Sequence, residues 1–169
     1  LDHDHYRHHP GRGRTPHITN PRYVQRDVTY LNVQPGARVL EIGTGSGYSG
    51  ALLARLTGPT GAVTSVDMDA YLARWANAIH HQDGTPAIRC HTANGTAGYP
   101  LDAPYDRIGA WCAPPLLPQA WVDQITENGR IVTTLPVAPV ADISVLAVLT
   151  VTGDRPEVEH LDLGSYIDA

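Results

Sequence analysis

A glycine-rich segment in the first third of the chain holds the residues best suited to chemistry. Residues 41–48 read Glu-Ile-Gly-Thr-Gly-Ser-Gly-Tyr, with glycines at alternate positions. Glycine lets the backbone turn tightly and approach a ligand closely. This spacing differs from the dinucleotide form GxGxxG, which aims a helix N-terminus at a pyrophosphate. A tight loop without a phosphate cradle suits a nucleoside with an amino-acid tail, such as S-adenosyl-L-methionine, although NAD or FAD stays open.

Acidic and amide side chains elsewhere in the chain complete the predicted cofactor site. Glu41 is expected to hold the amine end of the cofactor, directly or through water. Asp67 lies about twenty residues beyond the loop, where a carboxylate can accept both ribose hydroxyls. Asn94 is placed to accept from the adenine amine. The predicted cofactor-binding set is Glu41, Gly43, Thr44, Gly45, Ser46, Gly47, Asp67, Met68, Asn94 and Gly95.

An alternation of strands and helices is needed to bring these residues together. Strands are predicted over residues 37–42, 62–66, 87–91, 106–111 and 130–135, and helices over 20–31, 48–56, 69–81 and 117–126. Asn20 and Pro21 begin the first helix, and Asn128-Gly129 are expected to close the last. Two β-rich runs, 143–152 and 157–167, then follow one another. This order predicts a doubly wound, Rossmann-like α/β sheet, mostly parallel, with an antiparallel C-terminal hairpin.

The composition is that of one soluble domain. The chain has 169 residues, of which 42% are hydrophobic, and no apolar run approaches the ~18–20 residues of a membrane span. The net charge of −5 argues against a strong nucleic-acid binder. Two cysteines, Cys90 and Cys112, cannot form a disulfide framework, so we expect buried free thiols in a cytoplasmic protein with no membrane contact.

The first nineteen residues are rich in His, Arg, Gly and Pro and show no periodicity. They are predicted to form an arm, residues 1–19, before a single domain over residues 20–169. No cysteine or periodic scaffold fixes a ligand geometry for its histidines, so no metal site is expected. Residues 1–26 hold five Arg against two acids, whereas residues 101–169 hold ten acids against three Arg. The arm is therefore expected to lie where a negatively charged substrate approaches.

The segment after the fourth predicted strand argues against a nucleic-acid substrate. Methyltransferases that act on exocyclic base amines carry Asp/Asn/Ser-Pro-Pro-aromatic there, and this chain has Ala113-Pro114-Pro115-Leu116. Alanine cannot accept a hydrogen bond from an amine, and leucine cannot stack on a base. A cytosine C5 enzyme would need a Pro-Cys nucleophile, and Cys112 follows a tryptophan instead.

From about Thr15 to its end, the chain resembles the protein-L-isoaspartate O-methyltransferases. Residues 39–48 nearly repeat the wording of that family around the glycine loop, and residues 94–100 look like its Asp-Gly-Thr-x-Gly-Trp-Pro. His17-Ile18-Thr19-Asn20-Pro21 looks like its Thr-Ile-Ser-x-Pro substrate segment, which places Thr19 on the family's active-site serine.

The resemblance implies a class I S-adenosylmethionine-dependent methyltransferase fold and methyl transfer to an aspartyl or isoaspartyl carboxylate of a peptide or protein. Thr19 would then be the catalytic residue, and the substrate-binding residues would be His17, Ile18, Asn20 and Arg22. A carboxylate with a pKa near ~4 is already ionised at neutral pH, so no general base is needed. Catalysis would consist mostly of alignment and the exclusion of water.

The acceptor end departs from the family pattern. Arg22 stands where the family usually has His or Tyr, and Asn94 replaces the usual Asp. These departures suggest the hypothesis of a relative adapted to one peptide, for example an aspartate in a ribosomally made natural product. Two other classes stay open. One is a small-molecule O-methyltransferase, which would want a His or Asp base near the cofactor, and the other is a non-catalytic S-adenosylmethionine-binding module.

Overall fold

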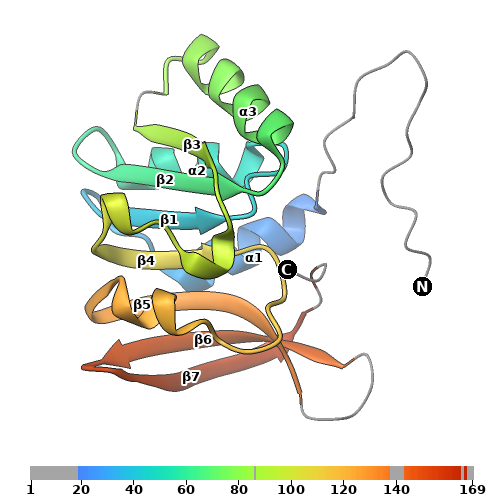
Figure 1. The fold of residues 1–169 in the computed structure, drawn as a ribbon, viewed down its shortest axis with the longest axis vertical. Helices are drawn as coiled ribbons and strands as arrows, with labels where there is room; N and C mark the ends of the chain where they lie inside the picture. The colour runs from blue at the N-terminus through green and yellow to red at the C-terminus, as the bar shows by residue number, and fades with distance from the viewer. Residues whose placement is uncertain (1–18, 86, 138–142, 165, 167–169) are drawn as a thin grey trace.

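One seven-stranded sheet forms the centre of the computed structural model, which describes residues 19–85, 87–137, 143–164 and 166 (Figure 1). The strands are β1 (Arg38–Ile42), β2 (Ala62–Asp67), β3 (Ile88–Thr92), β4 (Tyr105–Ala110), β5 (Ile125–Pro136), β6 (Ser144–Thr152) and β7 (Arg155–Leu163). The helices are α1 (Pro21–Leu31), α2 (Tyr48–Thr57), α3 (Ala70–Gln82) and α4 (Gln119–Asp123), with 3-10 turns at Gly95–Ala97 and Pro100–Asp102. His17, Ile18 and the rest of the predicted arm before Thr19 lie outside the described residues.

The order of the strands is β3-β2-β1-β4-β5-β6-β7. The first five strands run parallel, β6 runs antiparallel to β5, and β7 runs antiparallel to β6. The predicted sheet with its antiparallel C-terminal hairpin is therefore confirmed. The chain moves outward from β1 in one direction to β3 and then in the other to β7. Ligands of such sheets bind where this order reverses, outside the carboxyl ends of the strands.

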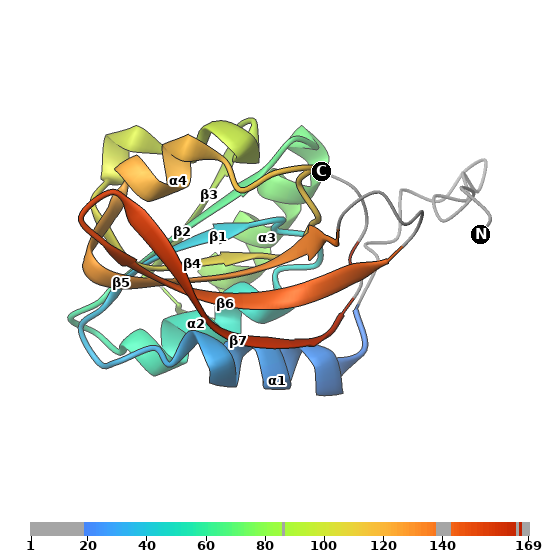
Figure 2. The same cartoon turned by 90° about the horizontal axis from the view of Figure 1, so that it is seen from below.

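Local signals place the first three helices close to their predicted positions. The Asn20 side chain accepts a hydrogen bond from the Arg22 backbone N–H at 3.0 Å, and Pro21 is the first residue of α1. Asp69 caps α3 by accepting from the Tyr71 N–H at 2.8 Å. Figure 2 shows α1 and α2 along one face of the sheet and α4 on the other.

The prediction of a helix over residues 117–126 is wrong at its C-terminal end. Helix α4 ends at Asp123, and β5 begins at Ile125. Asn128, with φ 58°, lies inside β5, and the register with β4 shifts between the Tyr105–Ile125 and Arg107–Arg130 pairs. An Asn-Gly pair is as compatible with an irregularity in a strand as with the end of a helix, because both structures need a residue with a positive φ. The local pattern therefore could not separate the two.

Two apolar clusters cover the two faces of the sheet. Val39 packs with the α1, α2 and α3 side, and its neighbour Leu40 packs with the α4 side, as alternating strand residues must. Trp121 is fully buried on the α4 side. Cys90 is buried in the other cluster, as predicted. Cys112 is only half-buried. Among the described residues, none of the helices combines the length and apolarity that crossing a bilayer requires.

Candidate active site

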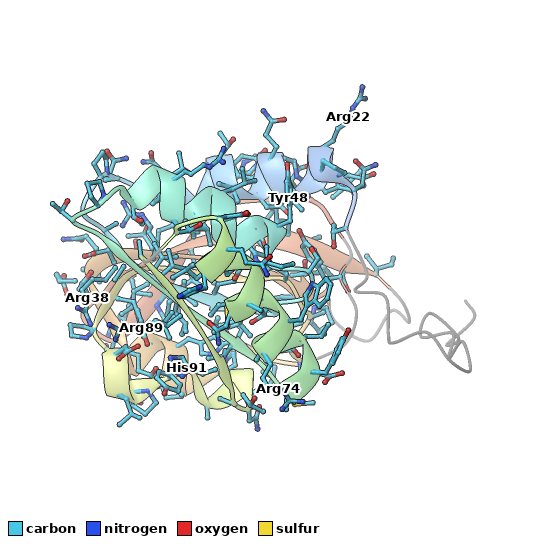
Figure 3. All side chains as sticks on the ribbon, turned by 90° about the horizontal axis from the view of Figure 1, so that it is seen from above. Arg22, Arg38, Tyr48, Arg74, Arg89 and His91 are labelled. Atoms are coloured by element: carbon cyan, nitrogen blue, oxygen red, sulfur yellow. The ribbon has the colours of Figure 1, made fainter. Side chains whose placement is uncertain are left out.

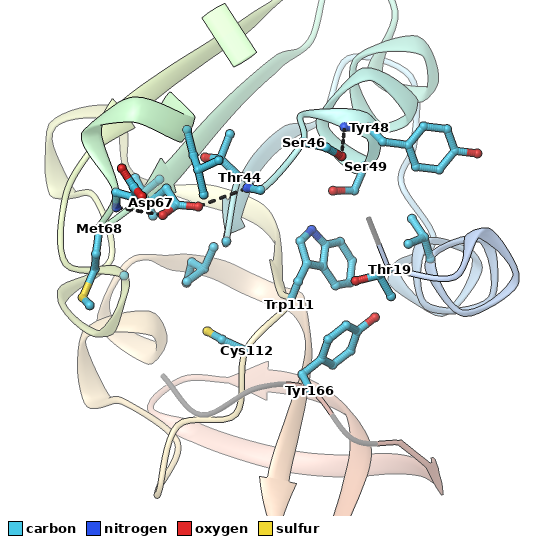
Figure 4. A pocket seen from close by; sticks show the side chains of 18 of the residues that line it. Thr19, Thr44, Ser46, Tyr48, Ser49, Asp67, Met68, Trp111, Cys112 and Tyr166 are labelled. Atoms are coloured by element: carbon cyan, nitrogen blue, oxygen red, sulfur yellow. Dashed lines mark hydrogen bonds between the residues drawn. The ribbon is translucent and has the colours of Figure 1, made fainter. Parts of the chain in front are cut away.

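A cavity of about 600 Å³ lies at the carboxyl ends of the central strands. Pockets for small ligands typically measure roughly 300–1,000 Å³. Figure 4 shows Asp67 and Met68 on one side of this cavity, Thr19 and Tyr166 on the other, and Trp111 between them. Most of the predicted site residues line it, namely Thr19, Asn20, Gly43, Thr44, Gly45, Ser46, Asp67, Met68, Asn94 and Gly95. Of the predicted residues that the structure describes, three do not, namely Arg22, Glu41 and Gly47.

The glycine loop turns from β1 into α2 through three positive φ angles. Gly43, Gly45 and Gly47 have φ 96°, 51° and 82°, a region that residues with a side chain rarely adopt. Gly47 lies behind the cavity wall as the N-cap of α2, and a Cβ there would come within 3.1 Å of the His80 Nε2 atom. Gly47 sets the path of the backbone, and this path keeps Gly43 and Gly45 against the cavity.

Asp67 is fixed at the end of β2 by two backbone groups. Its Oδ2 accepts from the Gly45 N–H at 3.0 Å, and its Oδ1 accepts from the Asp69 N–H at 2.9 Å. An ionised carboxylate has about four acceptor positions, so these two bonds leave capacity for two hydroxyl donors. Asp67 lines the cavity, and this free capacity is compatible with the predicted ribose contact.

Glu41 is fully buried and does not line the cavity, so the structure does not support direct contact with the cofactor amine. Its Oε1 accepts from Ser49 Oγ at 2.5 Å and from Trp111 Nε1 at 2.8 Å, and its Oε2 accepts from Ser65 Oγ at 2.6 Å. Burial raises the pKa of Glu41, against these three hydrogen bonds, which lower it.

The neighbours of Glu41 carry its influence to the cavity wall. Ser65 donates its only hydroxyl proton to Glu41, so Thr44 donates in the 2.7 Å contact between the two hydroxyls. Thr44, Ser49 and Trp111 all line the cavity. Glu41 therefore holds three residues of the cavity wall in place without lining the cavity itself. Sequence spacing alone could not distinguish this role from direct contact with a ligand.

Asn94 follows β3 and caps the 3-10 turn Gly95–Ala97. Its Oδ1 accepts from both the backbone N–H and the hydroxyl of Thr96, at 3.0 and 2.8 Å. Both lone pairs of that oxygen are then in use. The prediction that Asn94 accepts from an adenine amine is therefore not supported, and the group that it offers to the cavity is its Nδ2 donor. At Gly95, a Cβ would overlap the Ile42 side chain, so only glycine fits.

The wall on the α1 side is aromatic and uncharged. Thr19 and Asn20 lead into α1, and Tyr23 lies one turn further along the same wall. Trp111 contributes to this wall, as do Tyr48 and Tyr166. Tyr166 carries no local signal of a site, because a contact between the C-terminus and α1 spans most of the chain.

The arginines of α1 do not reach the cavity. Arg22 is exposed and projects away from the helix in Figure 3, so the structure does not support its predicted substrate contact. Arg26 donates to Asp27 Oδ1 at 2.7 Å and to the Leu163 carbonyl at 2.7 Å. Among the described residues, the charged side chains that line the cavity are Asp67 and Asp69. Within the described part of the chain, no group of His, Cys, Asp or Glu is arranged to hold a metal ion.

Cys112 also lines the cavity but is not activated. Burial raises the pKa of its thiol to about 11, with a smaller contribution from the Asp67 carboxylate. The thiolate is the nucleophilic form of cysteine. Near neutral pH this side chain is therefore a protonated wall group and not a nucleophile.

The family model described as "Protein-L-isoaspartate(D-aspartate) O-methyltransferase (PCMT)" matches residues 3–160. The chain belongs to this family. It is 35% identical to the protein-L-isoaspartate O-methyltransferase of Aeropyrum pernix over 90% of its own length and 57% of the relative's. It is 40% identical to the protein of that name from Methanoculleus marisnigri, over 76% of its own length and 56% of the relative's. The chain thus spans little more than half the length of these curated relatives.

Solved structures agree with the fold. The chain superposes on a protein-L-isoaspartate O-methyltransferase with a TM-score of 0.85, at 23% identity over 94% of this chain and 50% of that one. It matches a putative enzyme of the same name from Plasmodium falciparum, solved with S-adenosyl-L-homocysteine, with a TM-score of 0.77 at 18% identity over 89% and 74% of the two chains. These identities establish the fold alone. The names of these relatives lend no support to the natural-product hypothesis.

Proposed function

We propose that this chain carries an S-adenosyl-L-methionine-dependent carboxyl O-methyltransferase activity toward an isoaspartyl or aspartyl side chain of a peptide or protein. The observation that carries the proposal is one continuous cavity with two different walls. One wall is the glycine loop with Asp67, and the other is the start of α1 with Thr19. Membership of the family supports the substrate class, and the residues of both walls lie between Thr19 and Tyr166.

The described residues fit the cofactor. Asp67 offers free acceptor positions for two hydroxyls, and the backbone of Gly43 and Gly45 lies against the cavity. The Gly95 backbone packs so closely on Ile42 that a side chain there would clash, and both residues line the cavity. When bound, the cofactor supplies an electrophilic methyl group on a positively charged sulfur.

The acceptor wall suits a carboxylate that must stay nucleophilic. An acceptor with a pKa near ~4 arrives ionised, so the site needs no general base. An Arg or Lys at the acceptor would draw electron density from its oxygens, and the described lining residues include neither. The Thr19 hydroxyl is a neutral donor that can orient the carboxylate. The wall of Tyr23, Tyr48, Trp111 and Tyr166 keeps water from the reacting atoms.

The test uses the purified chain, cofactor labelled in its methyl group, and three peptides of one sequence that differ only in isoaspartate, aspartate or asparagine at one position. We expect label on the isoaspartyl or aspartyl peptide, released as methanol in mild alkali because methyl esters are labile to base. The asparagine peptide is the control for transfer elsewhere. Asp67→Ala should abolish incorporation by weakening cofactor binding, measured separately by calorimetry with S-adenosyl-L-homocysteine.

Each outcome separates the alternatives. Cofactor binding without label on any peptide would leave the small-molecule enzyme or the non-catalytic module. Absence of binding would remove both the proposal and those alternatives. Efficient methylation of many unrelated isoaspartyl peptides would contradict the hypothesis of adaptation to a single peptide.

A further inference from the structure

The C-terminal stretch from His160 to Tyr166 is tied to α1 by a chain of side-chain hydrogen bonds. Arg26 donates to the Leu163 carbonyl, and its Nη1 lies 3.6 Å from Asp162 Oδ2. The Tyr30 hydroxyl donates to Asp162 Oδ2 at 3.0 Å and lies 3.1 Å from His160 Nε2. One face of α1 therefore fixes the position of the C-terminal end of β7.

The last link of this chain reaches the cavity. The Tyr166 hydroxyl donates to Asp27 Oδ2, while Arg26 Nε donates to Asp27 Oδ1 at 2.7 Å. The Asp27 side chain is fully buried, and these two residues satisfy both of its oxygens. We call Arg26, Asp27 and Tyr166 the Asp27 latch. Burial and the Asp27 hydrogen bond raise the pKa of Tyr166, so its hydroxyl stays protonated and donates.

The latch connects two parts of the acceptor wall. Tyr166 lines the cavity and its ring lies 6.1 Å from that of Trp111, tilted by 46°. Asp27 lies one helical turn beyond Tyr23 and Val24, which line the same cavity from α1. Side chains three and four residues apart share a helix face, so Asp27 holds Tyr166 against the face that carries them. Gly164 keeps the backbone close to β6, because a Cβ there would lie 2.9 Å from Leu146 Cβ.

We infer that Tyr166 is a positioning residue for the methyl acceptor, held by its hydroxyl on Asp27 so that its ring closes the wall opposite the glycine loop. This inference rests on the proposed function for its kinetic consequence. Among the described residues, the glycine loop and Asp67 make no hydrogen bond with the Asp27 latch. Loss of the latch is therefore expected to affect the acceptor and to leave cofactor affinity unchanged.

Tyr30 provides a matched control. Tyr30→Phe and Tyr166→Phe each remove one phenolic hydroxyl that donates to a carboxylate and joins α1 to the C-terminal region. Only Tyr166 lines the cavity. Because Asp27 is buried and Asp162 is partly exposed, a purely structural role predicts a larger loss of stability in Tyr166→Phe with no acceptor-specific change in kinetics. A positioning role predicts a loss of kcat/KM for the peptide that Tyr30→Phe does not share.

The kinetic test measures kcat/KM for the isoaspartyl or aspartyl peptide and the Kd of S-adenosyl-L-homocysteine. We expect Tyr166→Phe to lower kcat/KM about tenfold, with Kd within about twofold of wild type, and Tyr30→Phe to change neither by more than about twofold. Asp27→Asn should act in the same direction, and the double variant should be less than additive because both remove one interaction. Equal losses in the two Phe variants, or a parallel loss of cofactor affinity, would overturn the inference.

A second measurement does not depend on catalysis. Cys112 lines the cavity and Cys90 is buried. At alkaline pH, where a larger fraction of the Cys112 thiol is ionised, its rate of alkylation by excess iodoacetamide reports on access to the cavity, with Cys90 as an internal control. We expect Tyr166→Phe to raise that rate several-fold, while Cys90 stays protected and Tyr30→Phe matches wild type. An unchanged Cys112 rate would contradict the latch. If no peptide is methylated but the rate rises, the proposed function fails and the latch stands.

Discussion

Trp111 donates its indole N–H to the buried carboxylate of Glu41, with 2.8 Å between Nε1 and Oε1 and seventy positions between the two residues in the chain. The bond joins the middle of the sheet to the loop after β4 and fixes the ring that separates the two walls of the cavity. Glu41 therefore acts on the site through Trp111, Ser49 and Ser65, without lining the cavity itself.

Glu41→Gln tests this role. The amide Nε2 cannot accept a hydrogen bond, so at least one of the Ser49, Ser65 and Trp111 donors loses its partner. An unsatisfied buried donor costs about 1–3 kcal/mol, which urea unfolding would detect. We also expect weaker S-adenosyl-L-homocysteine binding, because Thr44 and Trp111 lose their support. Unchanged stability with lost binding would point instead to direct contact of Glu41 with the cofactor.

The same carboxylate gives a pH dependence with a definite sign. Burial raises the pKa of Glu41 above its ordinary value of 4.5. The folded state therefore binds this proton more tightly than the unfolded state, and stability falls as pH rises. The loss begins near the unfolded pKa and is complete above the raised folded pKa. Glu41→Gln cannot titrate, so the free energy of unfolding of wild type minus that of the variant should decrease across this window. An increase would mean that the three hydrogen bonds outweigh burial.

Local patterns were sufficient for the order of the strands and helices because most elements carry their own signal, the boundary between α4 and β5 excepted. Asn20-Pro21 begins α1, the alternate glycines follow β1, and the apolar strand positions alternate between the two faces. The position of Asp67 was also predictable. Because β2 pairs in parallel with β1, its carboxyl end lies at the same edge of the sheet as the glycine loop. Residues whose role depends on a partner far away in the chain could not be predicted. The role of Glu41 depends on Trp111, and the role of Tyr166 depends on Asp27.

The sequence likewise did not reveal the contacts of the two arginines of α1, Arg22 and Arg26. Substitutions can distinguish their roles. Arg22 is exposed and contributes a backbone N–H to the helix cap, so Arg22→Ala should change stability by less than about 0.5 kcal/mol. Arg26→Ala removes a donor from buried Asp27 and should cost about 1–3 kcal/mol. Thermal unfolding of the two variants measures the difference. A large effect of Arg22→Ala on peptide KM, with stability intact, would restore its predicted substrate contact.

Asn94→Asp is expected to strengthen cofactor binding. The present Oδ1 is occupied by the two Thr96 bonds, so the side chain offers a donor to the cavity. In the variant, one carboxylate oxygen can keep the cap while the other accepts from the adenine amine. Calorimetry with S-adenosyl-L-homocysteine should show a Kd several-fold lower, consistent with about 1 kcal/mol for one added hydrogen bond. Asn94→Ala is the control, because it loses the cap. Weaker binding in the Asp variant would indicate that the Nδ2 donor is what the ligand uses.

Thr19 is the residue on which the catalytic prediction depends, and two substitutions separate its hydroxyl from its shape. Thr19 precedes the α1 cap and lines the cavity opposite Asp67. Thr19→Val keeps the branched side chain and removes the donor, so the acceptor carboxylate loses an orienting hydrogen bond at the moment of transfer. We expect kcat/KM for the peptide to fall about 10- to 100-fold, the effect of losing an alignment of this kind.

Thr19→Ser retains the hydroxyl and should stay within a few-fold of wild type, while the Kd of S-adenosyl-L-homocysteine should be equal in all three proteins. Full activity of Thr19→Val would show that backbone N–H groups alone hold the carboxylate. The role of the cofactor wall would be unchanged, and the backbone N–H groups at the start of α1 would be assigned as the donors to the acceptor carboxylate.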